Sequence, residues 1–349
     1  MAGGAGTRLW PISKKSSPKH LHALAGGKTL IQETVNRNLP LSGKERMLII
    51  SNSKQVPKIK KQLPHLKNII GEPTMRDTSG AIGLALAYIN RINPEAIVGF
   101  IPADHYIAKP KEYQKAIRLA QETVKKFPNA TVQIGFEPTE PNTGLGYIRK
   151  GEKIKNLDGV YKIKEFIEKP PLEKVKKFLE TGNYYWNGGM FIWKVSTALT
   201  LYKKHLPQTY KILLKIGDSI GSEDENAVIK REFPKIKKIS IDYAIIEKLK
   251  NQLFIPCDCR WTDIGNWRTL YDILKLRYGT NVVVDSKHIG IDTSDVIIMA
   301  KDKLVATIGI KNLVIISSDD AILVANKNRA QEVKEIVKRI EKNKDDKYL

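Results

Sequence analysis

The sequence predicts an α/β protein with a second, β-rich part at its C-terminal end. Three observations lead to this prediction. Helical stripes of apolar residues alternate with short apolar runs over the first 136 residues. A glycine-rich loop opens the chain, and four short β-rich runs follow one another after residue 280. At 349 residues, the chain is long enough for two or three domains with cores of their own.

The first half of the chain alternates between helix and strand patterns. Helices are expected at 30–39, 78–92 and 110–127, and strands at 46–51, 96–104 and 131–136. Such alternation predicts a parallel sheet covered by helices on both faces. Because ligands bind at the carboxyl ends of strands in these sheets, Asp104 and the segment 144–148 are expected near a site.

The chain changes character near residue 280. Four β-rich runs, DVIIMAKD, KLVATIGI, NLVIISSD and DAILVAN, recur about every nine residues, which predicts a small meander or a coil of a β-helix. We place a domain boundary near Tyr278–Thr280, which gives domains at 1–279 and 280–349. An open β coil has unpaired edges that a partner tends to cover, so we expect a homodimer.

A last helix is expected after these runs. Its apolar face is formed by Ala330, Val333, Val337 and Ile340. The residues that follow, 342–349, are expected to be a frayed tail.

Composition narrows the classes of function. The net charge of +22 is compatible with nucleic-acid binding, but the lysines are scattered along the chain and lack interleaved aromatic residues. We therefore expect phosphorylated small molecules as partners, and neither nucleic acid nor membrane. No apolar run approaches the roughly 18 residues of a membrane helix. Two closely spaced cysteines, Cys257 and Cys259, form no disulfide framework, which favours a cytoplasmic location.

The opening stretch MAGGAGTRLWPISKKSSPKH is a candidate phosphate loop. Leu9 stands where a dinucleotide fingerprint needs its third glycine, and the G-K-[ST] of a Walker A loop is absent. What remains is a glycine-rich backbone, whose amides can face phosphate oxygens, together with Arg8 and Lys19. The alternative is a flexible terminus followed by a basic loop.

This stretch and seven later motifs resemble the mannose-1-phosphate guanylyltransferases, or GDP-mannose pyrophosphorylases, of the sugar-phosphate nucleotidyltransferase family. The later motifs are EPTMRDTSGAI, FIPADH, GLGYI, FIEKP, YYWNGGMFIW, SIDYAIIEK and WTDIGNW, in this order. The resemblance extends over essentially the whole chain and implies a Rossmann-like mixed sheet flanked by helices, with a small β-helix-like domain.

The implied reaction is attack of mannose 1-phosphate on the α-phosphate of GTP, which needs positioning and charge neutralisation. Arg8 and Lys19 are the expected catalytic cations, and the backbone of Gly3, Gly4 and Gly6 is expected to line the nucleotide. The resemblance also implies Mg²⁺, with Asp104 and Asp263 as ligands. Two carboxylates suit this ion, which completes its octahedron with phosphate oxygens and water.

Two further groups of residues carry substrate recognition in this resemblance. The expected sugar-phosphate contacts are Gly146, Glu168, Lys169 and Asn187. The expected base contacts are Glu72, Arg76 and Thr78, although Ser79-Gly80 replaces the Ala-Pro that the family commonly shows. Thr78 is alternatively a helix cap, and we interpret Asp242 as a cap as well.

Several alternatives stay open at this level. The alternative functions are those of a thymidylyl- or uridylyltransferase, an inactive nucleotide-sugar sensor or a nucleic-acid-binding protein. His20 and His22 with the two cysteines make a weak candidate zinc site. Relatives run a central strand into the first glycines, so we expect the true chain to start upstream of Met1. Longer relatives carry an isomerase domain after this segment, and we expect no isomerase activity here.

Overall fold

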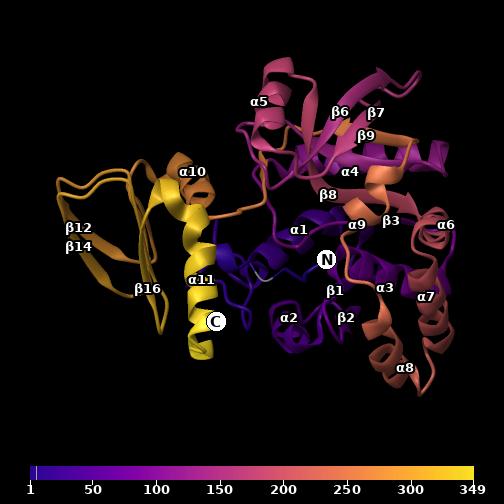
Figure 1. Ribbon diagram of the computed structural model, residues 1–349, viewed down its shortest axis with the longest axis horizontal. Helices are drawn as coiled ribbons and strands as arrows, with labels where there is room; N and C mark the ends of the chain where they lie inside the picture. Colours follow the sequence, from indigo (N-terminus) through magenta and orange to yellow (C-terminus); the bar gives the residue numbers. More distant parts are fainter. Residues whose placement is uncertain (5) are drawn as a thin grey trace. The chain divides into compact units, whose positions relative to one another are not determined.

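The computed structural model describes residues 1–4 and 6–349. By their internal contacts, these residues form two compact units, coloured along the chain in Figure 1. The first unit comprises Met1–Gly3, Asn36–Pro102 and Ile107–Trp261, and the second comprises Gly4–Val35, Ala103–Tyr106 and Thr262–Leu349. This division differs from the boundary predicted near residue 279, which remains a prediction.

The first unit is built on a six-stranded mixed sheet. Its order is β3 (Ile97–Phe100), β8 (Tyr184–Lys194), β5 (Thr131–Phe136), β9 (Gln252–Pro256), β7 (Tyr161–Ile167) and β6 (Gly146–Lys153). The β5–β9 pair is parallel, and the pairs β3–β8, β5–β8, β7–β9, β6–β7 and β6–β8 are antiparallel. The parallel sheet predicted from helix–strand alternation is therefore wrong, because the long strand β8 inserts antiparallel between β3 and β5.

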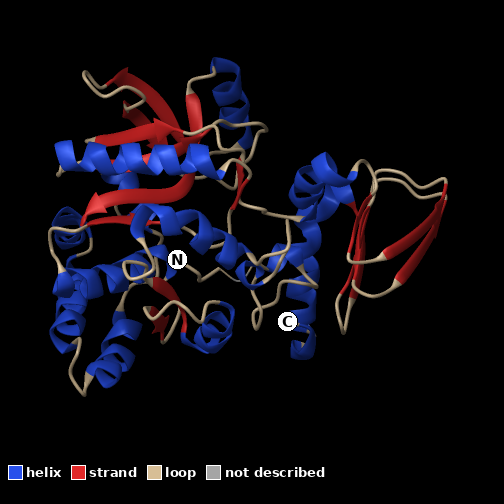
Figure 2. Cartoon of the chain, turned by 180° about the vertical axis from the view of Figure 1, so that it is seen from behind, coloured by secondary structure: helices blue, strands red, loops and turns tan. Residues whose placement is uncertain are grey.

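Side chains of this sheet alternate between two hydrophobic cores, as the two-residue period of a strand requires. In β8, Phe191 and Trp193 enter one core, whereas Met190 and Ile192 enter the other. The second core contains α4 (Pro110–Lys126) and α5 (Leu172–Thr181), and Figure 2 shows the long helix α4 lying across the strands. The first core holds α3 (Asp77–Ile92), α6 (Val195–His205), α7 (Pro207–Ser219), α8 (Glu225–Glu232) and α9 (Ile241–Ala244).

Three helices and three strands match the elements predicted from the sequence. The helices expected at 30–39, 78–92 and 110–127 are α1 (Leu30–Ser42), which runs from one unit into the other, α3 and α4. Of the expected strands, 46–51 is β1 (Ile49–Asn52), 96–104 is β3 and 131–136 is β5. Amphipathic stripes therefore predicted these elements correctly, with boundaries displaced by a few residues.

A small parallel sheet in the first unit begins beside the start of the chain. It pairs β1 with β2 (Ile69–Glu72), and α2 (Val56–Gln62) connects the two strands. The backbone of Ala2 donates to the Ile50 carbonyl at 2.8 Å, and the amino group of Met1 donates to the Ile101 carbonyl at 2.8 Å. Residues 1 and 2 therefore lie beside both β1 and the end of β3.

The second unit contains a short β-helix. Its strands are β11 (Val282–Val284), β12 (Lys287–Ile291), β13 (Ile297–Ala300), β14 (Leu304–Ile308), β15 (Leu313–Ser317) and β16 (Ile322–Asn326). Parallel pairs β11–β13–β15 form one wall and β12–β14 another, and β16 closes the first wall antiparallel to β15 (Figure 1). Of the two expected alternatives, the β-helix coil is confirmed and the meander is wrong.

The corners of the coil repeat along the chain. Left-handed backbone φ values occur in three pairs of residues whose members lie 17 positions apart: Asp285 and Asp302, Asp292 and Gly309, Asp295 and Asn312. Aspartate, asparagine and glycine tolerate this conformation best. Strands β11 and β12 belong to the same repeat, but they precede the four β-rich runs predicted from the sequence.

The glycine-rich opening of the chain shares the hydrophobic core of this β-helix. Leu9, Trp10 and Leu24 pack in one cluster with residues of α10 (Trp267–Tyr278), the β-helix and α11 (Val333–Lys342). The Trp267 indole donates to the Trp10 carbonyl at 3.0 Å. The Trp10 indole in turn donates to the Tyr348 carbonyl at 2.8 Å. The expectation that residues 342–349 are frayed is therefore wrong.

The remaining elements are short. They are β4 (Tyr106–Ile107), β10 (Trp261–Thr262) and the 3₁₀ turns η1 (Thr7–Leu9), η2 (Lys19–Leu21), η3 (Ser53–Gln55), η4 (Phe233–Lys235), η5 (Ile246–Lys248), η6 (Lys327–Glu332) and η7 (Asp346–Tyr348). Across the described residues, every helix is too short or too polar to cross a membrane.

Candidate functional site

The glycine loop is built around Gly6 in the second unit. Gly6 has a φ of +59°, and a Cβ atom there would lie 2.8 Å from Ser13 Oγ and 2.9 Å from the side chain of Lys19. Only glycine satisfies both constraints. Together with the burial of Leu9, this close packing argues against the flexible-terminus alternative. Ala5 lies outside the described residues.

Lys19 connects two separate segments of the second unit. Its ammonium lies 2.9 Å from Asp104 Oδ2 and donates to the backbone carbonyl of Asp263 at 2.6 Å. Burial acts to raise the pKa of Asp104, but the charges of Lys19 and His105 and the Lys19 hydrogen bond outweigh it and hold that pKa well below its usual range. Asp104 is therefore a carboxylate throughout the neutral range.

The remaining loop residues occupy different places. Gly4 lies beside the same carboxylate, since a Cβ atom there would be 3.8 Å from Asp104 Oδ2. The Arg8 guanidinium instead contacts Gln331 Oε1 at 3.4 Å on an exposed part of the unit. The structure thus brings Gly4, Lys19, Asp104 and Asp263 together and directs Arg8 to η6.

Sequence reasoning missed two histidines near Asp104 as site residues. His105 Nε2 lies 3.8 Å from Asp104 Oδ1. His20 is buried, its Nε2 atom has no hydrogen-bond partner among the described residues, and burial lowers its pKa to about 4. The adjacency of Lys19-His20 and Asp104-His105 in the chain was the available signal. His20 is therefore neutral and adds no positive charge beside Lys19.

The candidate metal ligands carry hard oxygen donors of the kind that Mg²⁺ prefers. The Lys19 ammonium is a cation already held by Asp104 Oδ2 and the Asp263 carbonyl. The Asp263 carboxylate lies close to Gly265, whose added Cβ would be 3.0 Å from Asp263 Oδ2. Asp104 and Asp263 are therefore both held beside the Lys19 ammonium, and their oxygen atoms are of the type that suits a hard divalent cation.

A zinc site has no support. Among the residues with described positions, no group of three or more His, Cys, Asp or Glu side chains could hold a metal ion. His22 Nε2 lies 2.9 Å from the Ser17 carbonyl, and Cys257 and Cys259 are free and buried.

The predicted sugar-phosphate residues meet where β6 begins and β7 ends, beside β8, in the first unit. Gly146 at the start of β6 pairs with Asn187 in β8, and Glu168 directly follows β7. A Cβ atom at Gly146 would lie 2.5 Å from Glu168 Oε2, so only glycine leaves room for this carboxylate. Lys169 Nζ lies 2.9 Å from Glu168 Oε1 and is half exposed. The structure therefore brings these four residues together.

Asp242 belongs to the same cluster, and its interpretation as a helix cap is wrong. Ser240 caps α9, because its Oγ accepts from the Tyr243 amide at 3.4 Å. Asp242 Oδ1 accepts instead from Asn187 Nδ2 at 2.8 Å. Burial, with a contribution from the Glu168 charge, raises the pKa of Asp242 to about 7. Ser240, two positions before Asp242, was the sequence signal: a serine that caps the helix leaves the Asp242 carboxyl available for another role.

The predicted base contacts are only partly brought together. Glu72 at the end of β2 is buried, and a Cβ atom at Gly3 would lie 3.9 Å from its Oε2. Burial raises the pKa of Glu72 to about 7, and its Oε1 has no hydrogen-bond partner among the described residues. Glu72 and Gly3 therefore face each other as predicted.

Arg76 and Thr78 make contacts within the fold. The Arg76 guanidinium donates to the Pro234 carbonyl. Thr78 Oγ1 accepts from the Ile241 amide at 2.8 Å, which links the start of α3 to α9. Because α3 begins at Asp77, with no side-chain cap from Arg76, the alternative of Thr78 as a cap is wrong.

Comparison with known proteins agrees with this arrangement. Residues 1–277 match the family described as Nucleotidyl transferase, and residues 286–340 match the MannoseP isomerase/GMP-like beta-helix domain. The second match and the observed coil confirm the predicted β-helix-like part. The first match, with the six-stranded sheet, confirms the mixed α/β fold that the resemblance implied.

Individual relatives span almost the whole chain. The mannose-1-phosphate guanylyltransferase RfbM of Salmonella typhimurium is 36% identical over 355 residues, covering 100% of this chain and 73% of that protein. The alginate biosynthesis protein AlgA of Pseudomonas syringae pv. tomato is 34% identical over 343 residues, covering 97% and 70%.

A solved structure extends this likeness to three dimensions. A protein of Thermus thermophilus, described as a mannose-1-phosphate geranyltransferase, has a TM-score of 0.87 and 32% identity over 98% of both chains. Family, relatives and fold all agree with the resemblance that the motifs carry. The chain belongs to the nucleotidyl transferase family, among the mannose-1-phosphate guanylyltransferases.

Proposed function

We propose that this chain transfers the guanylyl group of GTP to mannose 1-phosphate, releasing diphosphate and GDP-mannose. The observation that carries this proposal is the position of Lys19, whose ammonium bridges the Asp104 carboxylate and the Asp263 carbonyl beside the glycine loop. Phosphoryl-type transfer uses fixed cations of this kind, and the backbone of glycine-rich loops, to bind and neutralise phosphate oxygens.

In this reaction a phosphate oxygen of mannose 1-phosphate attacks the α-phosphorus of GTP. A new P–O bond forms, the bond from the α-phosphorus to the α–β bridging oxygen breaks, and the electron pair leaves with diphosphate. Lys19 faces these oxygens as a fixed positive charge, and Arg8, with one exposed contact to Gln331, is free to swing onto the departing diphosphate. Catalysis is then mainly positioning and charge neutralisation.

Mg²⁺ is the proposed cofactor, and Asp104 and Asp263 are its proposed ligands. When bound, a divalent ion neutralises phosphate charge and orients the triphosphate for in-line attack. Lys19 already holds Asp104 ionised, as the lowered pKa of that carboxyl shows, so the ligand needs no deprotonation before an ion binds.

The sugar is proposed to bind at the cluster of Gly146, Glu168, Asn187 and Asp242. Two carboxyl groups and an amide offer both acceptors and a donor, the combination that recognises neighbouring hydroxyl groups. The half-exposed Lys169 ammonium is available to the sugar's phosphate. Glu168 and Asp242 lie close enough for the charge of one to raise the pKa of the other, so a hydroxyl donor between them relieves their repulsion.

Glu72 is proposed to select the base. Guanine presents its N1–H and N2–H₂ donors side by side, and a carboxylate accepts both. Glu72 is buried, and its Oε1 lacks a partner within the described structure, so an incoming pair of donors would satisfy it. Uracil and thymine offer one ring N–H between two carbonyls and would leave one carboxylate oxygen unpaired.

Diphosphate release from each nucleoside triphosphate with each sugar 1-phosphate, with and without Mg²⁺, tests the function. We expect the highest kcat/KM for GTP with mannose 1-phosphate and almost no product without the metal. Equal rates with dTTP or UTP and glucose 1-phosphate would show one of the other transferases instead. Absence of product from every pair, with nucleotide still bound, would identify a sensor.

The proposed assembly is a homodimer formed through the β12–β14 wall of the β-helix. This two-stranded wall exposes large aliphatic side chains, with Ile289 63%, Ile291 59%, Leu304 59% and Ile308 72% accessible. Contiguous exposed apolar side chains on a sheet with open edges are typical of an interface. A second copy of this chain supplies the same apolar surface, as a two-fold contact requires.

A cytoplasmic location is also proposed. Its support is that Cys257 and Cys259 are free thiols, which persist best in a reducing compartment.

A further inference from the structure

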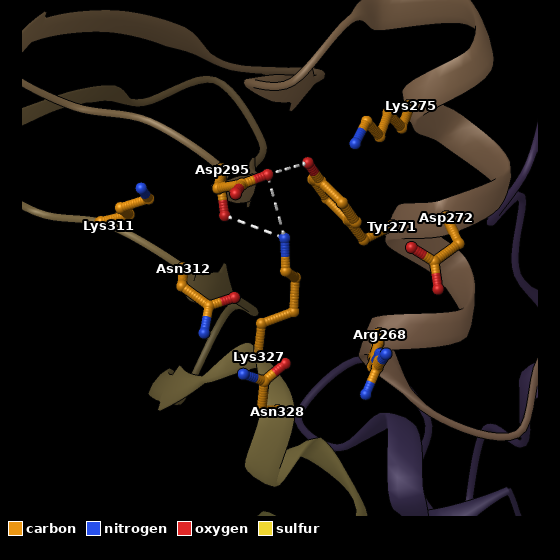
Figure 3. A pocket seen from close by; sticks show the side chains of 9 residues that line it. All are labelled: Arg268, Tyr271, Asp272, Lys275, Asp295, Lys311, Asn312, Lys327 and Asn328. Carbon is orange, nitrogen blue, oxygen red and sulfur yellow. Dashed lines mark hydrogen bonds and ion pairs between the residues drawn. The ribbon is translucent and has the colours of Figure 1, made fainter.

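A polar pocket in the second unit lies among residues that the proposed reaction does not use. Its volume is about 610 Å³ (Figure 3). It is lined by four residues of α10, by three from the two turns that precede β13 and β15, and by two from η6: Arg268, Tyr271, Asp272, Lys275, Asp295, Lys311, Asn312, Lys327 and Asn328. None of these is a proposed catalytic, metal or substrate residue.

Contacts within the β-helix fix one wall of this pocket. Asp295 and Asn312 are equivalent corners of successive coils, and the backbone of Lys327 donates to the Asn312 carbonyl at 2.9 Å. Helix α10 is attached to the same wall, because the Tyr271 hydroxyl donates to Asp295 Oδ1 at 2.6 Å. The lining residues therefore come from four segments, and these contacts hold the four segments together.

The charge of Asp295 is compensated inside this wall. Lys327 is only 7% exposed and donates to the carbonyl and the carboxylate of Asp295 at 3.2 and 3.4 Å. Its ammonium also lies 3.4 Å from the centre of the Tyr271 ring. The hydrogen bond from Tyr271 and the charge of Lys327 hold the pKa of Asp295 below its usual range. Asp295 is thus mainly an internal partner of Lys327.

The cations that remain form no close ion pair, although the Asp272 carboxylate lies near enough to Arg268 and Lys275 for their charges to act on its pKa. Arg268, Lys275 and Lys311 are exposed, and none forms an ion pair within 4.0 Å of a carboxylate in the described part of the chain. Figure 3 shows them on different sides of Lys327 and Tyr271. With four cations and two carboxylates, the lining carries two net positive charges, which matches a dianion.

We propose that this pocket binds a small molecule that carries a phosphate dianion. Arg268, Lys275 and Lys311 take the phosphate oxygens through charge-assisted hydrogen bonds. The side chains of Asn312 and Asn328 and the Asp272 carboxylate offer the donors and acceptors that hydroxyl groups need, so a hexose phosphate satisfies more of the lining than free phosphate does.

Calorimetric titration of the full chain at about 150 mM salt tests this proposal. The probes are mannose 6-phosphate, inorganic phosphate, unphosphorylated mannose and sulfate. The first probe has a hexose and a phosphate but no anomeric phosphate to attack GTP. We expect saturable binding of mannose 6-phosphate or of inorganic phosphate, no heat of binding with mannose, and weaker binding of sulfate. If mannose 6-phosphate binds more tightly than inorganic phosphate, the sugar contributes to binding.

The variant Arg268→Gln/Lys311→Gln removes two cations of the pocket. We expect it to weaken binding of the phosphate compound by at least about tenfold, because two charge-assisted hydrogen bonds to the phosphate are lost. The matched control, Arg277→Gln/Lys301→Gln, removes the same charge from α10 and the β-helix outside the lining, and should bind within twofold of the wild type.

Both double variants should catalyse guanylyl transfer at the wild-type rate, because none of these residues belongs to the proposed catalytic site. The single variant Lys311→Gln changes only an exposed turn and serves if the double variant does not fold. No binding to the wild type at millimolar concentrations, or equal loss in variant and control, overturns the proposal. The proposed function is tested separately by diphosphate release and does not depend on this result.

Discussion

The ammonium of Lys19 lies 2.9 Å from Asp104 Oδ2 and at the same time donates to the carbonyl of Asp263 at 2.6 Å. One side chain of the opening loop thereby joins the turn between β3 and β4, in FIPADH, to the loop after β10, in WTDIGNW, segments that are far apart in the sequence. Lys19 is only 8% exposed, so its charge acts with little screening by water.

Replacing Lys19 by methionine should remove the positive charge while preserving most of the side-chain volume. We expect kcat/KM for diphosphate release to fall at least about 100-fold, or about 2.7 kcal/mol of transition-state stabilisation. The control is Lys15→Met, which changes an exposed lysine of the same loop paired with Glu341. A value of kcat/KM within twofold of the wild type for Lys19→Met would exclude the catalytic role of Lys19.

Asp263→Asn should weaken the metal site without changing its shape. We expect the Mg²⁺ concentration for half-maximal activity to rise at least about tenfold, because a neutral amide is a poorer ligand for a hard cation than a carboxylate. Asp258→Asn is the control, since Asp258 is an exposed carboxylate paired with Lys109. If both variants show the wild-type dependence on Mg²⁺, Asp263 is not a metal ligand.

Gly146→Ala should displace Glu168, because the added Cβ would lie 2.5 Å from Glu168 Oε2. We expect KM for mannose 1-phosphate to rise at least about tenfold, since a carboxylate moved by a fraction of an ångström loses its hydroxyl contacts. KM for GTP should change little. Gly217→Ala is the control, because no atom lies within 4 Å of a Cβ there and alanine favours a helix. A larger effect on GTP than on the sugar phosphate would contradict this assignment.

Asp242 should make stability depend on pH. Burial and the Glu168 charge raise its pKa from 3.8 to about 7. A carboxyl with a raised pKa binds its proton more tightly in the folded state, so its contribution to stability is present at low pH and is lost as the pH rises from 3.8 to about 7. Between about pH 4 and pH 8, Asp242→Asn should therefore gain about 4 kcal/mol of unfolding free energy relative to the wild type, because each unit of pKa shift corresponds to about 1.4 kcal/mol.

Urea unfolding at both pH values measures this difference. Asp224→Asn, at the exposed start of α8, has no side-chain capping bond and is the matched control. If the unfolding free energies of the wild type and Asp242→Asn change with pH in the same way, folding does not raise the pKa of Asp242.

Ile289→Lys/Ile308→Lys should separate the proposed dimer. Each change places a charge on the β12–β14 wall, and burying an unpaired ammonium in an apolar interface costs several kcal/mol. Light scattering after gel filtration should report the mass of one chain for the variant and two for the wild type. Ile92→Lys, at a residue 84% exposed at the end of α3, should leave the mass unchanged. A wild-type protein with the mass of one chain would rule out the dimer.

The spacing of apolar residues predicted the helices correctly, but it did not predict how the strands pair. The stripes of α1, α3 and α4 depend on neighbours three and four positions apart, which the sequence displays directly. The antiparallel insertion of β8 between β3 and β5 depends on contacts between distant segments, which single-strand patterns do not encode. The 17-residue recurrence of left-handed corners was readable, since aspartate, asparagine or glycine occupies each of them.

Site residues divide in the same way. The motifs placed Lys19, Asp104 and Asp263 in one site, and the structure brings them together. Asp242 was assigned to a cap because the capping role of Ser240 was overlooked. No sequence pattern shows that Thr78 connects α3 to Ile241, because that contact exists only after the chain has folded.

The packing of the opening loop against the β-helix also determines when the enzyme matures. During synthesis, residues 4–35 leave the ribosome long before residues 262–349, yet Leu9, Trp10 and Leu24 find most of their apolar partners in the later segment. Until then these side chains remain in water, available to chaperones or to other nascent chains. The position of Lys19 is consequently set in the last stage of translation, so a ribosome that stalls before the β-helix yields a protein without its phosphate loop in place.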